Sequence, residues 1–192
     1  MPSNRSGLDR AKLTIERLQK DSIEDFAAFS CGDDDLDDFI RSDALRLQEL
    51  SVARTYVARH EAHACGYVTL MTDAVVLKVN ERKKIRGSDG ASLTFHDHPV
   101  VPALKVARIA VSTAARQAHR GIGETLVRFA FLRGLDLSEY AGCRLLTLDA
   151  YPESLGFYEK LGFVANLDES YANRARQSMR LDLFAPARPP WL

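Results

Sequence analysis

The chain has 192 residues, 46% of them hydrophobic, and its 26 Lys+Arg balance 26 Asp+Glu. A chain of this length can bury a core without disulfides or metals, and its zero net charge excludes an overall field that would favour nucleic acid or an anionic membrane. Cys31, Cys65 and Cys143 are widely spaced without a Cys-x-x-Cys pair. They indicate reduced, partly buried thiols rather than a disulfide framework or a zinc site.

The ends of the chain differ in composition from its middle. No apolar run approaches the roughly 18 residues of a membrane span, and residues 1–12 are polar rather than a basic and then apolar secretion signal. We therefore expect a cytoplasmic protein with a loose leader at 1–12, a single domain at 13–184 and an irregular tail at 185–192.

A strand and an amphipathic helix are predicted first. Residues 13–18 alternate apolar and polar side chains, as a strand does. The acids at 33–35 precede apolar residues spaced by three or four, namely Leu36, Phe39, Ile40, Ala44 and Leu47. These acids fall in the first turn of the helix, where its dipole favours negative charge. Adjacent acids can also bind a metal ion, but a helix start favours capping.

A β-hairpin is predicted next. Residues 55–58 and 66–70 are rich in β-forming side chains and flank a polar turn at 59–63. We interpret His60 and His63 of this turn as solvated side chains rather than metal ligands. Residues 75–79 have the composition of a further strand of the sheet.

Two polar segments precede the central strand. The connector at 80–90 carries the basic residues Arg82, Lys83, Lys84 and Arg86. We interpret it as a solvated loop, the alternative being a rim that meets an anionic acceptor. His96 and His98 flank Asp97, but Pro99 argues against the regular strand that a His-x-His metal site would need. We therefore expect loop histidines near the entrance of an active site.

The central stretch predicts a phosphate-binding turn. An apolar strand at 106–111 leads through a polar connector to Gly121-Ile122-Gly123 and a helix over 124–132. The first N–H groups of a helix lack intrahelical partners and point toward the preceding turn, where they can bind an anion. No Gly-Lys-Ser/Thr follows, and the third glycine of the dinucleotide fingerprint is missing, so neither nucleotide motif fits.

A second strand and helix follow the central helix. Residues 143–150 predict a buried strand, 152–160 a short helix that Gly162 terminates, and 178–184 a last strand. The order strand, helix, strand, helix implies a right-handed crossover and parallel pairing of the two strands.

Two motifs in this order resemble the GCN5-related N-acetyltransferases (GNAT). The first is the strand, Gly-x-Gly turn and helix at 106–132. The second runs from Leu148 to Phe163 and contains Phe-Tyr-Glu-Lys-x-Gly-Phe. Phe29-x-Cys31-Gly32 with Leu36-Asp37-x-Phe39, and Thr55-Tyr56-Val57, resemble the branch that includes toxins acting on aminoacyl-tRNA. The resemblance covers about 13–184 and implies an α/β fold, with a mixed, mainly antiparallel sheet, a splayed parallel strand pair and flanking helices.

The resemblance also implies a site. Acetyl-CoA would be bound by the main chain of Ile109, Ala110 and Val111 and by the turn, with no metal. The turn residues are Arg116, His119, Arg120, Gly121, Ile122, Gly123 and Glu124. Ala118 stands where the family usually has Gln or Arg, and His119 where many members have Gly, so cofactor binding should be weaker but not abolished.

Tyr158 is implied as the acid that protonates the CoA thiolate. A phenol is neutral near pH 7 and can hold its proton until a thiolate forms. The alternative is a core aromatic residue beside Phe157. Nothing identifies a general base, since Asp149, Glu153, His96 and His98 are candidates by proximity only. An amine of lowered pKa, as in an aminoacyl ester, would need none.

We expect an N-acetyltransferase that moves acetyl to a primary amine. One alternative is a toxin of a toxin–antitoxin pair that acetylates aminoacyl-tRNA, with charged tRNA and a small antitoxin as partners. A second is a non-catalytic acyl-CoA-binding module, suggested by Ala118. A homodimer is consistent with the sequence, which identifies neither the acceptor nor the oligomeric state.

Overall fold

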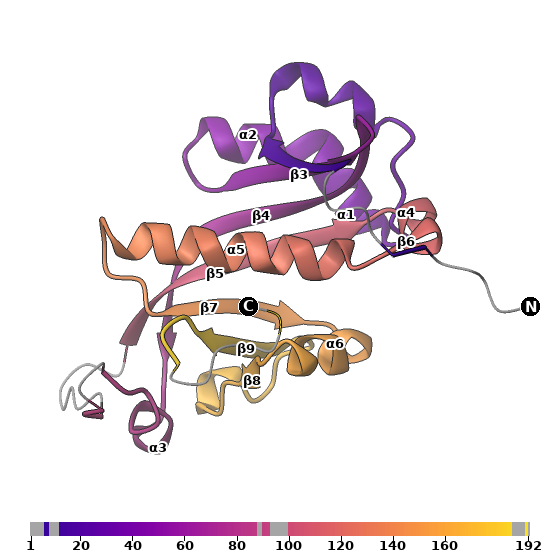
Figure 1. Ribbon diagram of the computed structural model, residues 1–192. Coiled ribbons are helices and arrows are strands. Elements are labelled where there is room, and N and C mark those ends of the chain that lie inside the picture. The colour runs from indigo at the N-terminus through magenta and orange to yellow at the C-terminus, as the bar shows by residue number, and fades with distance from the viewer. Residues whose placement is uncertain (1–5, 8–11, 88–89, 93–99, 186–190, 192) are drawn as a thin grey trace, which may run out of the picture. The chain divides into compact units, whose positions relative to one another are not determined.

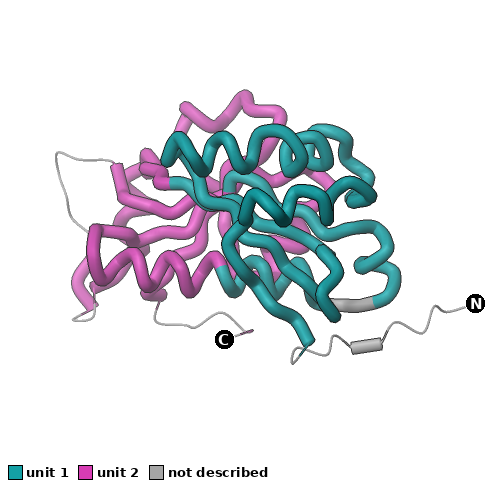
Figure 2. Tube along the Cα trace, turned by 90° about the horizontal axis from the view of Figure 1, so that it is seen from above, with its two compact units in different colours: residues 1–71, 107–129 teal, residues 72–106, 130–192 magenta. Residues whose placement is uncertain are grey.

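A computed structural model describes residues 6–7, 12–87, 90–92, 100–185 and 191. Seven strands form one sheet in the order β2-β3-β4-β5-β7-β9-β8, and two short strands pair separately as β1-β6 (Figure 1). Among the described pairings of the seven-stranded sheet, β5 with β7 is parallel and the others are antiparallel, so the predicted mixed, mainly antiparallel sheet is confirmed. The chain divides into unit 1, residues 1–71 and 107–129, and unit 2, residues 72–106 and 130–192 (Figure 2).

Unit 1 begins with an antiparallel hairpin and its edge strand. The strands are β2 (Leu13–Arg17), β3 (Arg54–His60) and β4 (His63–Val76), with β2 paired to β3 and β3 to β4. The turn is shorter than the predicted 59–63, because Glu61 and Ala62 alone form it, with φ of 50° and 70°. Positive φ at both central residues is the geometry of a tight hairpin turn. His60 and His63 therefore lie in strands, directly opposite each other.

The predicted amphipathic helix forms with an interruption. It consists of α1 (Asp34–Asp38), a π-helical turn η4 (Phe39–Asp43) and α2 (Ala44–Glu49), preceded by the 3-10 turns η2 (Lys20–Ser22) and η3 (Glu24–Phe26). The Asp33 carboxylate accepts hydrogen bonds from the N–H groups of Asp35 and Leu36 at 3.0 and 3.3 Å. The capping role predicted for the acids is confirmed. In the described part of the chain, no group of three His, Cys, Asp or Glu residues could hold a metal ion.

Aromatic side chains form the core of unit 1. Tyr67 is fully buried and stacks on Phe39 at a centroid distance of 6.1 Å, with Phe29 at 5.9 Å and Phe26 at 6.4 Å. Its hydroxyl donates to the carbonyl oxygen of Leu36 at 2.7 Å. The core thus holds the helical segment against β4 with little freedom to shift.

Unit 2 is built on the parallel strand pair. β5 (Val100–Val111) pairs with β7 (Leu145–Ala150) from Ala103↔Leu145 to Val106↔Leu148. β7 pairs antiparallel with β9 (Gln177–Asp182), and β8 (Val164–Ala165) covers the other side of β9. The predicted parallel pairing is confirmed, and the splay of the pair beyond Val106 stays a prediction.

The prediction of a strand at 75–79 is wrong for its second half. β4 ends at Val76, and Val79–Arg82 form the short helix α3. The cause is Glu81, which is 1% exposed and accepts from the Lys78 N–H at 3.0 Å and from the Arg180 guanidinium at 2.6 Å. A buried carboxylate needs such partners. The helical turn of α3 brings the Lys78 N–H within hydrogen-bond distance of the Glu81 carboxylate.

Several helices complete the chain. They are α4 (Thr113–Ala118), α5 (Ile122–Ser138), η5 (Pro152–Ser154), α6 (Leu155–Lys160) and η6 (Glu169–Tyr171). Of the predicted tail, Trp191 is described, and its indole N–H donates to the Leu161 carbonyl oxygen at 2.9 Å. None of the described helices is both long and apolar enough to cross a membrane.

The three cysteines are free and buried, as predicted. Burial raises the pKa of Cys31 and of Cys65 to about 11, so near pH 8 only about one thiol in a thousand is ionised at either position. We expect the native protein to resist a thiol reagent at that pH and all three thiols to react after unfolding in guanidinium. Rapid stoichiometric labelling of a native thiol would contradict this burial.

Candidate active site

The glycine turn is built as the sequence predicts, with one addition. The polar connector before it is a helix, α4, followed by the two-residue strand β6 (His119–Arg120). Gly121 then takes a φ of +96°, a conformation that favours glycine. A Cβ at Gly121 would meet no heavy atom of the described chain within 4 Å, so the space beside this turn is open.

The start of α5 supplies the anion-binding groups. At this start the Thr125 N–H donates to the Gly121 carbonyl at 2.9 Å, and the Thr125 hydroxyl donates to the same oxygen. The first N–H groups of a helix lie at the positive end of its dipole and point toward the preceding turn. Figure 1 shows α4 and β6 at this end of α5. The turn therefore has the geometry of an anion site.

Part of the expected loose leader lies against this turn. Ser6–Gly7 form β1, which pairs in parallel with β6, Ser6 opposite His119 and Gly7 opposite Arg120. This pairing involves the main chain just before Gly121 and stops short of it. The side chains of His119 and Arg120 lie outside the described part of the structure, so their predicted role at the rim stays a prediction.

Gly66 sets the position of the predicted thioester strand. A Cβ at Gly66 would lie 2.6 Å from the Ala110 carbonyl oxygen and 3.4 Å from the Val111 Cα, so β4 and β5 approach each other more closely here than any other residue allows. Ala110 is buried, whereas Ile109 and Val111 are partly exposed. Beyond the strand, the Ser112 N–H donates to the Cys65 carbonyl at 2.9 Å.

Arg116 holds a neighbouring loop. Its guanidinium donates to the Cys31 carbonyl oxygen and approaches the Thr113 hydroxyl at 3.5 Å, and the Thr113 N–H donates to the Ser30 carbonyl at 2.8 Å. Gly32 completes the loop with a φ of +86°. Arg116 therefore has a positioning role in this structure, and its predicted contribution to cofactor binding stays a prediction.

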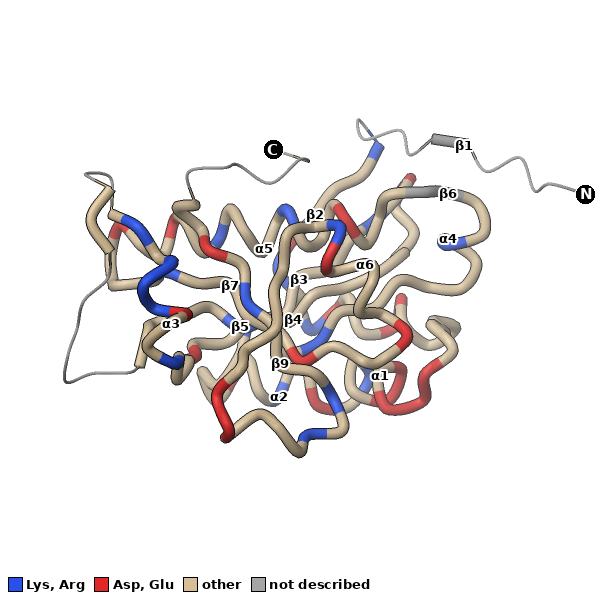
Figure 3. The backbone as a smooth tube through the Cα atoms, turned by 90° about the horizontal axis from the view of Figure 1, so that it is seen from below, with Lys and Arg blue, Asp and Glu red and all other residues tan. Residues whose placement is uncertain are grey.

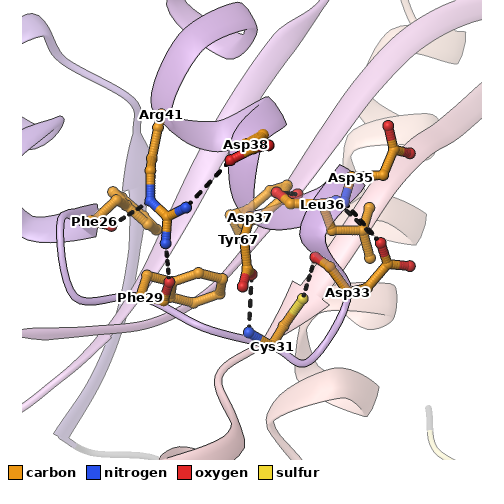
Figure 4. A network of polar contacts seen from close by, with 10 residues as sticks. All are labelled: Phe26, Phe29, Cys31, Asp33, Asp35, Leu36, Asp37, Asp38, Arg41 and Tyr67. Atoms are coloured by element: carbon orange, nitrogen blue, oxygen red, sulfur yellow. Dashed lines mark hydrogen bonds and ion pairs between the residues drawn. The ribbon is translucent and has the colours of Figure 1, made fainter.

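Figure 4 shows further hydrogen bonds that hold the loop around Cys31, from residues of the segment before α2. The buried Asp37 accepts from the Cys31 N–H at 2.9 Å, and Arg41 donates to the carbonyls of Phe26 and Phe29 at 3.2 and 2.5 Å. Phe29, Cys31 and Asp37, three of the residues quoted for the amino-terminal resemblance, thus take part in the hydrogen bonds that hold this loop beside the start of α4.

Tyr158 lies on α6 in unit 2 and is 8% exposed. Its ring contacts Phe157 and Phe163 edge-on at 5.0 and 5.7 Å, and burial raises its pKa to about 12. Its hydroxyl makes no hydrogen bond to the residues that the structure describes, unlike that of Tyr67. Gly162, with φ +89°, ends the helix as predicted. The cofactor residues at 109–124 belong to unit 1.

The base candidates are not brought together. Asp149 forms an ion pair with Lys105 at 2.7 Å, and Glu153 is exposed on η5. His96 and His98 lie outside the described residues. In the basic run, Lys83, Lys84 and Arg86 are exposed and follow α3, which appears with blue segments in Figure 3.

Comparison with known proteins gives the family. The sequence profile of the acetyltransferase (GNAT) domain matches residues 51–165, which include both motifs and Gly66. The chain belongs to the GNAT acetyltransferase family. It is therefore an acetyltransferase of the GNAT type, which confirms the predicted enzyme class.

The relatives within the GNAT family include toxins. A tRNA-acetylating toxin of Mycobacterium tuberculosis is 25% identical over 142 residues, 73% of this chain and 78% of that protein. The solved structure of AtaT complexed with acetyl-methionyl-tRNAfMet has a TM-score of 0.71 at 22% identity, covering 88% of this chain and 94% of that one. A third match is a tyrosine-to-phenylalanine mutant of the toxin AtaT, bound to the C-terminus of its antitoxin AtaR and acetyl-CoA. Its TM-score is 0.68 at 21% identity, and the match covers 90% of this chain and 94% of that one. These structures share the GNAT fold.

Proposed function

We propose that this protein transfers acetyl from acetyl-CoA to the α-amino group of an aminoacyl-tRNA. The observation that carries the cofactor assignment is the open turn at Gly121, where the start of α5 presents main-chain N–H groups to an anion. The acceptor is supported by the similarity to a tRNA-acetylating toxin and to AtaT, whose solved structures include a complex with acetyl-methionyl-tRNAfMet.

Main-chain groups would hold most of the cofactor. The N–H groups from Gly121 to Glu124 would bind the diphosphate, and the main chain of Ile109, Ala110 and Val111 would bind the pantetheine arm and the thioester. Because main-chain groups carry this binding, Ala118 at the usual Gln or Arg position weakens it without abolishing it.

Tyr158 would act as the acid of the reaction. The acceptor nitrogen forms a bond to the acetyl carbon as the carbon–sulfur bond breaks, and Tyr158 gives its proton to the departing thiolate. The proton lost by the amine goes to solvent. An α-amino group next to an ester is neutral in large part near pH 7, so no general base is required, in agreement with Asp149 being held by Lys105.

An acceptor panel tests this proposal. We would measure thiol release from acetyl-CoA with charged tRNA, the same tRNA uncharged, a lysine peptide and a polyamine. We expect release with charged tRNA only. Faster release with the peptide or the polyamine would assign another amine. Tight acetyl-CoA binding without release from any amine would favour the acyl-CoA-binding module. Growth arrest on expression, relieved by a small antitoxin partner, would support the toxin role.

The exposed lysines after α3 provide a further prediction. Replacing Lys83 and Lys84 together by glutamine should raise the KM for charged tRNA at physiological salt and lower the slope of log KM against log salt by roughly 1 to 2, because each phosphate contact releases about one counterion. Lys20→Gln, at another exposed lysine in η2, is the control for loss of a surface lysine charge elsewhere. An unchanged slope in the double variant would remove this run from tRNA binding.

A further inference from the structure

Arg108 is a partly buried cation with few partners. It lies on β5 directly before Ile109, and its side chain is 32% exposed. One guanidinium N–H donates to the carbonyl of the adjacent Ala107 at 3.1 Å. The carboxylate of Asp35 lies 3.8 Å away, beyond hydrogen-bond distance. The Nε atom is buried and has no hydrogen-bond partner among the described residues.

Other arginines of unit 1 are satisfied far better. Arg41 donates to two main-chain carbonyls and to Asp38. Arg59 donates to Glu16 at 2.7 Å, to Asp25 at 2.5 Å and to the Ala62 carbonyl. Buried donors are almost always paired in native proteins, and an exception needs a reason. The five donors of Arg108 make one hydrogen bond to the described residues, and its buried Nε–H has no acceptor among them.

The surroundings of Arg108 fix its position. The guanidinium carbon lies 5.4 Å from the centroid of the Phe39 ring, a cation–π contact, and that ring is stacked on the buried Tyr67. Phe39 is the first residue of the π-helical turn η4. π-Helical turns occur frequently at functional sites. A planar cation is therefore held against a rigid ring beside an irregular helix turn, with only a long ion pair to Asp35 at 3.8 Å.

We propose that Arg108 binds the ester carbonyl oxygen of the aminoacyl group, as an acceptor-binding residue. This inference rests on the proposed function, in which the main chain of Ile109 holds the thioester. A planar fork of N–H donors fits carbonyl and phosphate oxygens alike. The carbonyl is the assigned partner because it lies next to the reacting amine, and Arg108 is the residue next to the predicted thioester strand.

Arg108→Met tests the proposal, since methionine keeps an unbranched apolar side chain at this position while it removes every donor. We would measure kcat/KM for charged tRNA and for an amino acid methyl ester, the Kd for acetyl-CoA, and Tm. We expect kcat/KM to fall about tenfold or more with both acceptors, the Kd to stay within about twofold, and Tm to change little. Tm should not fall by much, because the loss of one local hydrogen bond, the cation–π contact and the long ion pair is offset by removal of an unpaired buried donor.

Arg41→Met is the matched control. It removes hydrogen bonds to the Phe26 and Phe29 carbonyls, so it should lower Tm. An Arg108→Met variant that loses Tm like the control would show a structural role and overturn the proposal, as would an unchanged kcat/KM. A loss with charged tRNA but not with the methyl ester would assign a phosphate in place of the carbonyl. Failure of the proposed function would appear in the wild-type protein as no transfer to either acceptor, and this inference would fall with it.

Discussion

Replacing Tyr158 by phenylalanine should lower the turnover of acetyl transfer about tenfold or more, while the affinity for acetyl-CoA changes by less than about twofold. The substitution removes only a hydroxyl that makes no hydrogen bond to the described residues, and it keeps the ring between Phe157 and Phe163. Stability should therefore be unaffected. Turnover and Kd are measured by thiol release and by titration with acetyl-CoA.

The pKa of Tyr158 adds a pH dependence to this prediction. Burial disfavours the phenolate and raises the pKa to about 12, so the proton stays on the hydroxyl until the pH approaches that value. The acid form is fully present at neutral pH, and the wild-type rate should not fall through ionisation of Tyr158 near its usual pKa of about 10.

Tyr67→Phe is the control for loss of a tyrosine hydroxyl. It removes the 2.7 Å hydrogen bond to the Leu36 carbonyl and should reduce the free energy of unfolding by about 1 kcal/mol, with turnover near that of wild type. Equal turnover of Tyr158→Phe and wild type would remove Tyr158 from the mechanism.

Replacing Gly66 by alanine should destabilise the protein by about 3 kcal/mol and weaken acetyl-CoA binding. The added Cβ would lie 2.6 Å from the Ala110 carbonyl oxygen, a main-chain atom that cannot rotate away, and 3.3 Å from Leu126 Cδ1. The strands must separate, which displaces the residues proposed to hold the thioester. Denaturation in urea and titration with acetyl-CoA measure the two effects.

Gly156→Ala is the matched glycine control. Its Cβ would meet no described atom within 4 Å, and Gly156 lies inside the helix α6. The substitution should be neutral or stabilise by up to about 1 kcal/mol, since alanine is the better helix former. A Gly66→Ala protein with the urea midpoint of wild type would show that the close approach of β4 to β5 is not needed.

The elements that carry the motifs were predictable because their signals are local. The strand, glycine turn and helix at 106–132 need only apolar periodicity and two glycines, and the helix with Tyr158 is marked by Pro152 and ended by Gly162. Gly66 was also detectable in principle, because an isolated glycine within a strand pattern indicates a close backbone approach. The approaching atom belongs to Ala110, which the sequence alone could not identify.

The features that sequence patterns missed depend on distant partners. The sequence pattern places Glu81 in a charged loop. In the structure Glu81 is buried and paired with Arg180, 99 residues away, and it lies in the helix α3. Arg108 reads as a polar interruption of an apolar strand. Arg108 is distinguished by the few partners around its guanidinium. These partners are known only when Phe39 and Asp35 have been placed in space.

The most direct test of the account follows the acetyl group itself. The purified protein would be incubated with labelled acetyl-CoA and charged tRNA, and the aminoacyl ester would be cleaved by mild base and analysed by mass spectrometry. The account predicts an amino acid acetylated on its α-nitrogen, in an amount equal to the thiol released. Thiol release without acetylated amino acid, or label recovered only on protein, would contradict it.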